Sequence, residues 1–291
     1  MGSNSIRLAI YKFDSVGNYK EIKKEKVAAR LINYLDKQGK LTDDGLKLIL
    51  HILKEFQKTI ESIEISDVIS FTTAVIRQAV NQEEILSEIK KHTGFSLIVL
   101  SEYEEAYYGY IGVIDTIDLK DGITIDIGGG STEITLFKDK EMKEYHSFPF
   151  GAVSLNAEFT NEEQVTNTQL MDLRANLLSQ FESLPWLAKG SKPIIGIGGT
   201  VRNLGRIYQK KNQTDQNILQ FEDVKEILQA LSSMPTSERS KIKGLSKKRK
   251  DIIIPGIMII LTLLEFVQAP YFMYSEQSVR DGVIKEMLLK K

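Results

Sequence analysis

The residues best suited to chemistry lie in one short stretch, in which Asp126 precedes three consecutive glycines at positions 128–130. Glycine has no Cβ and tolerates positive φ, so the backbone N–H groups of such a turn can approach an anion closely. Asp126 stands just before the turn, where its carboxylate could hold a Mg²⁺ ion that bridges phosphate oxygens. A plain hairpin turn needs only Gly-Gly or Asn-Gly. The triple glycine with its polar neighbours therefore favours phosphate binding over an ordinary turn.

Two further side chains extend this stretch. Ser131 adds a hydroxyl directly after Gly128, Gly129 and Gly130, and Glu133 follows two residues later. Glu133 could hydrogen-bond across a hairpin or join the shell of a metal ion, and a solvated cross-strand charge is the alternative. Isoleucines alternate with polar residues on both sides of the glycines, which predicts a strand, a turn and a returning strand.

A second strand-to-glycine turn lies at Gly198, Gly199 and Thr200, directly after the apolar residues 193–197. A helix is expected to begin there. Because the N-terminus of a helix carries free N–H groups and a positive dipole end, a glycine-lined approach to it favours anions.

Glu105 is the candidate for acid–base chemistry. It begins a helix that directly follows an apolar strand at residues 97–100. A carboxylate at that edge of a sheet could accept a proton from water that attacks phosphorus. In the alternative interpretation, Glu102, Glu104 and Glu105 only complement the helix dipole, as acids in the first turn often do.

Cationic side chains at or near turns could complete an anion site: Arg77, Lys247 and Arg249. The basic run at 247–250 suits a polyanionic ligand, although a solvated surface turn has the same composition. Ser3 and Asn4 stand ahead of the first strand in a Gly-Ser-Asn-Ser sequence that has the composition of a second phosphate turn.

Strands alternate with helices along the chain, which predicts a doubly wound α/β fold with ligands at the carboxyl ends of the strands. We expect two lobes, residues 1–117 and 118–291, divided between a Tyr-rich helix and the central hairpin. The apolar run 252–264 contains Pro255 and Gly256 and is too short to span a bilayer, so it predicts a buried helix.

Composition narrows the possible functions. The chain has 291 residues, of which 42% are hydrophobic, enough for two domains with sizeable cores. The net charge is −1 and basic residues are not interleaved with aromatic ones, so no nucleic-acid partner is expected. The absence of cysteine and the three scattered histidines argue against disulfides, thiolate or histidine metal sites and a Ser-His triad. We expect a soluble, cytoplasmic protein without a membrane partner.

In their order along the chain, these motifs resemble the exopolyphosphatase / guanosine pentaphosphate phosphohydrolase (Ppx/GppA) family of the actin–sugar kinase–Hsp70 superfamily. The strongest match is residues 126–133, and the other matching segments are residues 2–8, 73–81, 101–106, 150–153, 196–200, 244–253 and 278–282. The resemblance covers the whole chain. Actins and sugar kinases share the glycine turns but not the Glu-Glu-Ala or Gly-Leu-Ser segments.

The resemblance implies two ribonuclease-H-like lobes of the actin-like ATPase type, closing on a cleft that holds Mg²⁺ and a phosphate chain. It makes Glu105 the general base for water, and it makes Asp126 and Glu133 the metal-associated acids. It also implies a homodimer. With the turns above, the candidate phosphate-binding residues are Ser3, Asn4, Arg77, Gly128, Gly129, Gly130, Ser131, Gly198, Gly199, Thr200, Lys247 and Arg249.

The sequence departs from the family pattern in three places. The first phosphate motif of the family is a strand ending in Asp-x-Gly-Ser-Asn, but Met1 stands where x should be, so that Asp and the first strand are absent. We therefore expect weak or no activity compared with a version extended by one strand. Glu102 and Tyr103 replace the usual Gly-x, and the C-terminal helical domains with which longer members process long polymers are also absent.

The leading hypothesis is a Mg²⁺-dependent exopolyphosphatase that releases orthophosphate from the end of inorganic polyphosphate by in-line attack of water. The closest alternative is the same chemistry at the 5′ end of guanosine pentaphosphate. Two other classes remain: a sugar or acetate kinase on the same fold, for which no acceptor site is evident, and a non-catalytic polyphosphate- or nucleotide-binding regulator.

Overall fold

The chain forms two compact units, Met1–Ser101 and Glu102–Lys291. The computed structural model describes residues 1–16, 18–188 and 190–288. The sequence analysis puts the boundary after residue 117, one helix later than the structure does. The helix Glu102–Ile114 (α4) accounts for the difference, because its buried side chains pack on the sheet of the C-terminal unit.

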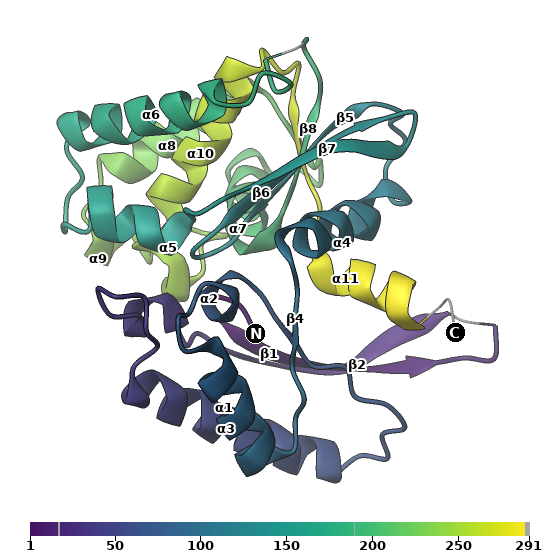
Figure 1. Ribbon diagram of the computed structural model, residues 1–291. Helices are drawn as coiled ribbons and strands as arrows, with labels where there is room; N and C mark the ends of the chain where they lie inside the picture. The colour runs from purple at the N-terminus through teal and green to yellow at the C-terminus, as the bar shows by residue number, and fades with distance from the viewer. Residues whose placement is uncertain (17, 189, 289–291) are drawn as a thin grey trace. The chain divides into compact units, whose positions relative to one another are not determined.

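The N-terminal unit contains two strand pairs, three α-helices and a 3-10 turn among its described residues (Figure 1). In chain order these are β1 (Ile6–Phe13), β2 (Tyr19–Val27), the turn η1 (Leu31–Tyr34), α1 (Asp43–Glu61), β3 (Phe71–Thr72), α2 (Ala74–Arg77), α3 (Gln82–Thr93) and β4 (Ile98–Val99). Strands β1 and β2 pair antiparallel, and β3 and β4 pair parallel.

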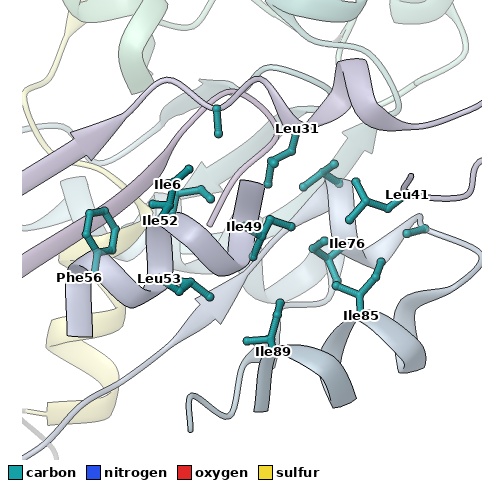
Figure 2. Packing of buried hydrophobic residues seen from close by; sticks show 13 residues of the cluster. Ile6, Leu31, Leu41, Ile49, Ile52, Leu53, Phe56, Ile76, Ile85 and Ile89 are labelled. Carbon is teal, nitrogen blue, oxygen red and sulfur yellow. The ribbon is translucent and has the colours of Figure 1, made fainter. Parts of the chain in front are cut away.

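The core of this unit lies between β1 and the helices α1, α2 and α3 (Figure 2). Apolar residues recur at helical spacing on α1, and Thr42 caps its N-terminus by accepting a hydrogen bond from the amide of Gly45, at 3.3 Å. Labelled in Figure 2 are the larger core side chains: Ile6, Leu31, Leu41, Ile49, Ile52, Leu53, Phe56, Ile76, Ile85 and Ile89.

The first residue pairs with β3. The amino group of Met1 donates to the carbonyl of Phe71 at 2.5 Å, and the amide of Thr73 donates to the carbonyl of Met1 at 3.2 Å. These two bonds reach Phe71 on β3 and Thr73 directly after it, two residues apart, as the bonds of a parallel neighbour do. The turn that follows, at Ser3 and Asn4, is thereby held at the carboxyl end of β3.

The C-terminal unit is built around one sheet of six strands (Figure 1). After α4 its elements are β5 (Gly122–Ile127), β6 (Thr132–Lys138), β7 (Glu141–Phe148), α5 (Ala152–Leu155), the π-helical turn η2 (Asn156–Thr160), α6 (Asn167–Glu182), β8 (Ile194–Ile197), α7 (Gly198–Asn212), β9 (Ile218–Leu219), α8 (Phe221–Ser232), α9 (Thr236–Arg239), the 3-10 turn η3 (Lys247–Arg249), α10 (Ile253–Phe266), β10 (Phe272–Tyr274), α11 (Val279–Val283) and the π-helical turn η4 (Ile284–Leu288).

The strand order is β7-β6-β5-β8-β10-β9. Strands β5, β6 and β7 form an antiparallel meander, whereas β8 runs parallel to both β5 and β10. The predicted strand–turn–strand around the triple glycine is the β5–β6 hairpin. Because β5 and β8 are parallel neighbours, the turns that follow them lie side by side at the same edge of the sheet.

Two groups of helices pack around this sheet. Helix α10 is buried along almost its whole length and contacts α6, α7 and α8, which confirms the buried helix predicted from its apolar run. Helices α4 and α11 pack closely together because both carry glycines at their contact. A Cβ at Gly112 would come within 2.8 Å of the carbonyl of Ser278, and one at Gly282 would overlap the carbonyl of Tyr108. Within the described residues, no helix is both long and apolar enough to cross a membrane.

Candidate active site

Three carboxylates converge at one end of the sheet in the C-terminal unit. Asp126 on β5 and Glu133 on β6 are direct cross-strand partners, so both side chains project from the same face of the hairpin. Glu105 lies in the first turn of α4, which packs against β5, β6 and β7. Glu105 and Glu133 are both buried. The three acids named by the sequence analysis are therefore neighbours in space.

The surroundings of Glu133 shift the pKa of its carboxyl group. Burial raises the pKa of its carboxyl well above the ordinary value, and the negative charges of Glu105 and Asp126 raise it further. Hydrogen bonds from Ser147, at 2.8 Å, and from Ser131 act in the opposite direction and stabilise the ionised form. A buried acid among other acids is costly without a positive partner, which is the electrostatic pattern of a functional site.

The triple-glycine turn is fixed by the short helix α5. The carbonyls of Gly128 and Gly129 accept hydrogen bonds from the amides of Ala152, Val153 and Ser154, at 2.9 to 3.1 Å. Because a trans peptide places its N–H opposite its C=O, the amides of Gly129 and Gly130 point away from α5. They are thus oriented as a group, as anion binding by a turn requires.

The reason for these glycines differs from the prediction. Positive φ is found at five glycines of the described chain, Gly39, Gly94, Gly190, Gly198 and Gly244, and not at the triple glycine. The turn needs glycine because of close packing. A Cβ at Gly128 would lie 2.9 Å from the carbonyl of Ser131, and a Cβ at Gly151 would lie 2.6 Å from the backbone of Gly129.

The second turn lies beside the first. Gly198 begins α7 directly after β8 with a φ of 94°, and a Cβ there would overlap Oδ1 of Asp126. The carboxylate of Asp126 is therefore held against the N-terminus of a 15-residue helix, where the dipole favours negative charge. Gly198 therefore has the positive φ that was predicted for the triple-glycine turn.

The basic segment is joined to α7 by Arg249 and Asn203. The guanidinium of Arg249 is buried, donates to the hydroxyl of Thr200 at 3.2 Å, and fills the space in which a side chain at Gly199 would project. Asn203 donates to the carbonyl of Gly199 and accepts from the amide of Ser246, both at 2.7 Å. Lys247, in contrast, is exposed on the 3-10 turn.

The remaining predicted residues belong to the N-terminal unit. Ser3 and Asn4 are buried, and their carbonyls accept hydrogen bonds from the amides of Ile32 and Arg30. Arg77 ends α2 and donates from Nη1 to the carbonyl of Leu100 at 2.9 Å. The carbonyl of Thr72, at the end of β3, accepts from the amide of Leu100. These residues thus gather at the carboxyl ends of β3 and β4.

The carboxylates beside the glycine turns provide part of the oxygen ligands that a Mg²⁺ ion needs. Among the residues that the structure describes, no group of three or more acidic or histidine side chains is arranged as a metal site. Mg²⁺ typically takes only one or two protein carboxylates and completes its shell with water and phosphate oxygens. Asp126 and Glu133, paired across β5 and β6, provide two such carboxylates.

Three contributors are not among the predicted site residues. Ser147 reaches Glu133 because β7 pairs with β6 in the register Glu133 to Ser147. Asn203 joins two segments of the site, as described above. Arg202 donates to the carbonyls of Glu276 and Gln277, and its charge interacts with that of Asp126. Burial lowers the pKa of the Arg202 guanidinium.

Acidic side chains beside two glycine turns, on an α/β fold, are features of enzymes that transfer phosphoryl groups. Residues 9–291 match the Ppx/GppA phosphatase family, and the chain belongs to that family. This membership agrees with the resemblance of the motifs.

Relatives of known name agree with this assignment. The bifunctional 3-dehydroquinate synthase/phosphatase of Fusobacterium nucleatum is 28% identical over 98% of this chain, which spans only 45% of that protein. Exopolyphosphatase 1 of Mycobacterium leprae is 24% identical over 99% of this chain and 88% of its own length.

Solved structures agree on the fold. The Aquifex aeolicus member of the Ppx/GppA family is 27% identical with a TM-score of 0.83, covering 100% of this chain and 96% of its own. An exopolyphosphatase from Cytophaga hutchinsonii, 22% identical, covers the same shares with a TM-score of 0.89, which shows the shared fold.

Proposed function

We propose that this protein removes orthophosphate from the end of inorganic polyphosphate and that Mg²⁺ is its cofactor. The observation that carries the proposal is the group of Glu105, Asp126 and Glu133 beside two glycine turns, in which burial and the charges of Glu105 and Asp126 raise the pKa of Glu133. The similarity to exopolyphosphatase 1 of Mycobacterium leprae supports the choice of substrate.

Glu105 serves as the general base in this proposal. Its carboxylate takes a proton from a water molecule whose oxygen attacks the terminal phosphorus, while the bond from that phosphorus to the bridging oxygen breaks. The products are orthophosphate and a chain shorter by one phosphate. Asp126 and Glu133 would hold Mg²⁺, which when bound neutralises negative charge on the phosphoryl oxygens.

The backbone and the cationic residues bind the phosphate chain. The amides of Gly129 and Gly130 and the N-terminus of α7 at Gly198 to Thr200 supply donors where negative charge develops. Lys247 is an exposed cation of the basic turn, and Arg249 fixes the position of Gly199 and Thr200. Ser3, Asn4 and Arg77 are the residues of the N-terminal unit that we predict to bind phosphate.

Phosphate release from inorganic polyphosphate with Mg²⁺ tests the proposal. Glu105→Gln keeps the shape of the side chain but cannot accept the proton, so release should fall at least about 100-fold. Glu102→Gln is the matched control, because Glu102 is an exposed acid in the same first turn of α4. It should retain the release rate of the parent protein.

Thermal unfolding of the parent protein and of each variant shows whether the fold survives. Release of phosphate by Glu105→Gln at the rate of the parent protein would show that Glu105 is not the base. Binding of polyphosphate without release by the parent protein would replace the enzyme with a binding regulator.

A further inference from the structure

The guanidinium of Arg202 holds the segment that leads from β10 to α11. Its Nη1 atom donates to the carbonyls of Glu276 and Gln277, at 3.1 Å each. Arg202 lies one turn after Gly198 on α7, and its side chain is only 14% exposed. Backbone carbonyls that are shielded from water need a donor, and a planar guanidinium supplies several donors from one rigid group. Arg202 thus ties the segment to the helix that begins at the second glycine turn.

The next arginine on α7 contacts the same segment in a different way. Arg206, one turn after Arg202, donates from Nη2 to both carboxylate oxygens of Glu276, at 3.3 Å each. The two side chains of this ion pair are 54% and 57% exposed. Exposed ion pairs are screened by solvent and contribute little to stability. The backbone contacts of Arg202 therefore fix the segment, and Arg206 serves as a matched comparison.

The segment continues directly into α11. Ser278 follows Gln277, and its hydroxyl donates to Oδ2 of Asp281 at 2.7 Å. The carbonyl of Ser278 accepts from the amides of Asp281 and Gly282, at 2.9 and 3.4 Å. Val279 is the first residue of the helix. Because these bonds fix the first turn of α11 to Ser278, the position of Gln277 determines where Val279 lies.

Val279 packs against α4 one turn away from Glu105. Helix α11 lies beside α4 (Figure 1). A Cβ at Gly109 would lie 3.9 Å from Cγ2 of Val279 and 3.1 Å from Cδ1 of Ile197, the last residue of β8. Gly109 follows Glu105 by one helical turn, so both residues lie on the same face of α4. Contacts at Gly109 therefore set the position of the turn that carries Glu105.

We propose that Arg202 is a positioning residue, whose bonds to the carbonyls of residues 276 and 277 seat α11 against α4 and thereby hold Glu105 in place. The inference rests on the proposed function, in which Glu105 accepts a proton from the attacking water. A general base must lie within hydrogen-bond reach of that water, and a displacement of about 1 Å costs about 100-fold in rate.

The positioning role predicts a specific kinetic effect. The triple-glycine turn is held by α5, and the turn at Gly199 is held by Arg249, so neither depends on Arg202. Loss of the Arg202 bonds should therefore lower kcat and leave KM for polyphosphate unchanged. A residue that contacts phosphate would change KM instead.

The experiment measures kcat and KM for phosphate release from inorganic polyphosphate with Mg²⁺. In Arg202→Gln, which loses both the charge and the bonds, kcat should fall by about 10- to 100-fold. Arg202→Lys keeps the charge, but its side chain ends short of the position of Nη1, so kcat should fall here too. Arg206→Gln removes only the exposed ion pair and should keep the kcat of the parent protein.

Two further measurements test the path itself. Val279→Ala weakens the contact with α4 while Arg202 stays intact, so it should lower kcat even if Arg202→Gln is too unstable to assay. In the double variant the loss of kcat should be smaller than the product of the two single losses, because both changes act on one path. Hydrogen–deuterium exchange needs no turnover. In Arg202→Gln the amides of residues 106–114 and 279–283 should exchange faster than in the parent protein, and those of residues 170–182 on α6 should not.

A kcat equal to that of the parent protein in Arg202→Gln would overturn the positioning role. So would an unchanged kcat in Arg202→Lys, which would show that the charge alone is needed, and so would a rise in KM without a fall in kcat, which would make Arg202 a contact of the phosphate chain. Failure of the parent protein to release phosphate would overturn the proposed function instead. The exchange rates would then still test the path, and unchanged exchange at residues 106–114 in Arg202→Gln would refute it.

Discussion

The carboxylate of Asp126 fills the space in which a side chain at Gly198 would project. The contact joins the end of β5 to the start of α7, and it sets the position of the candidate metal ligand. Gly198 also has a φ of 94°, which L-residues rarely adopt. The chain therefore needs glycine here for two independent reasons.

Gly198→Ala should abolish phosphate release, because the new methyl group displaces Asp126. It should also lower the free energy of unfolding by more than the roughly 1–2 kcal/mol that left-handed backbone costs a non-glycine residue. Denaturant unfolding and phosphate release are the measurements. Gly94→Ala separates the two effects, since Gly94 has a φ of 71° but open space around its Cβ position. Equal losses of stability in the two variants would show that Asp126 moves without cost.

Glu133→Gln should raise stability above that of the parent protein when no divalent cation is present. Burial and two neighbouring acids raise the pKa of Glu133 from its ordinary value of 4.5. A raised carboxyl pKa makes the folded state hold its proton longer than the unfolded state, so stability is lost as pH rises above 4.5 toward the raised pKa. Glutamine cannot ionise, and the variant escapes that loss.

The measurement is the Tm of both proteins in the presence of a chelator, taken at intervals of about half a pH unit between about pH 4 and pH 9. The difference between variant and parent should be small at the acidic end and grow with pH. Glu144→Gln, an exposed acid on β7, serves as the control and should track the parent. A difference that is constant with pH would exclude ionisation as its cause. Phosphate release by Glu133→Gln should be lost.

Asn203→Ala should weaken the binding of polyphosphate. The side chain joins the carbonyl of Gly199 to the amide of Ser246, and its loss leaves both groups without that partner, at a cost of about 1–3 kcal/mol. The basic turn after Ser246 then loses its fixed place beside α7, so KM should rise more than kcat falls. Asn212→Ala, which removes an exposed asparagine from the same helix, is the control. Equal changes in KM and kcat for both variants would contradict a positioning role.

Two buried threonines should respond in opposite directions to valine. Among the described residues, the hydroxyl of Thr262 on α10 has no hydrogen-bond partner, whereas that of Thr132 donates to the carbonyl of Phe150 at 2.8 Å. Both side chains are fully buried. Thr262→Val removes an unsatisfied polar group and should raise the free energy of unfolding by about 1 kcal/mol, while Thr132→Val should lower it by about 1–3 kcal/mol. Denaturant unfolding tests both, and a loss of stability in Thr262→Val would indicate a bound water at that hydroxyl.

Signals that lie within a few residues were enough to predict the elements that carry the candidate site. Strands rich in isoleucine that run into glycines mark the β5–β6 hairpin and the start of α7. The same pattern places Asp126 near the end of β5 and Glu133 near the start of β6. The contact of Ser147 with Glu133 depends instead on the register of β6 and β7. That register is set by a turn in which Asp139 and Lys140 both have positive φ, and by a shift in register between Leu136 and Phe137, and no glycine marks either feature.

Contacts between distant segments could not be predicted from local patterns. Arg249 meets Gly199 and Thr200 across about fifty residues of sequence, and no periodicity records such a pairing. The boundary between the two compact units, which differs from the predicted one, also depends on such contacts. Helix α4 belongs to the C-terminal unit because Gly112 and Gly282 allow α4 and α11 to come into contact. Each of the two segments, taken alone, predicts an ordinary helix and gives no sign of that contact.

The hydrogen bonds between the triple-glycine turn and α5 also bear on the thermodynamics of binding. A glycine loop that is free in solution loses much conformational entropy when a ligand orders it, since glycine has the largest backbone freedom of any residue. Here the carbonyls of Gly128 and Gly129 are already held by α5, so that entropy is lost on folding and not on binding. A phosphate that arrives at the turn therefore meets donors that are ordered in advance.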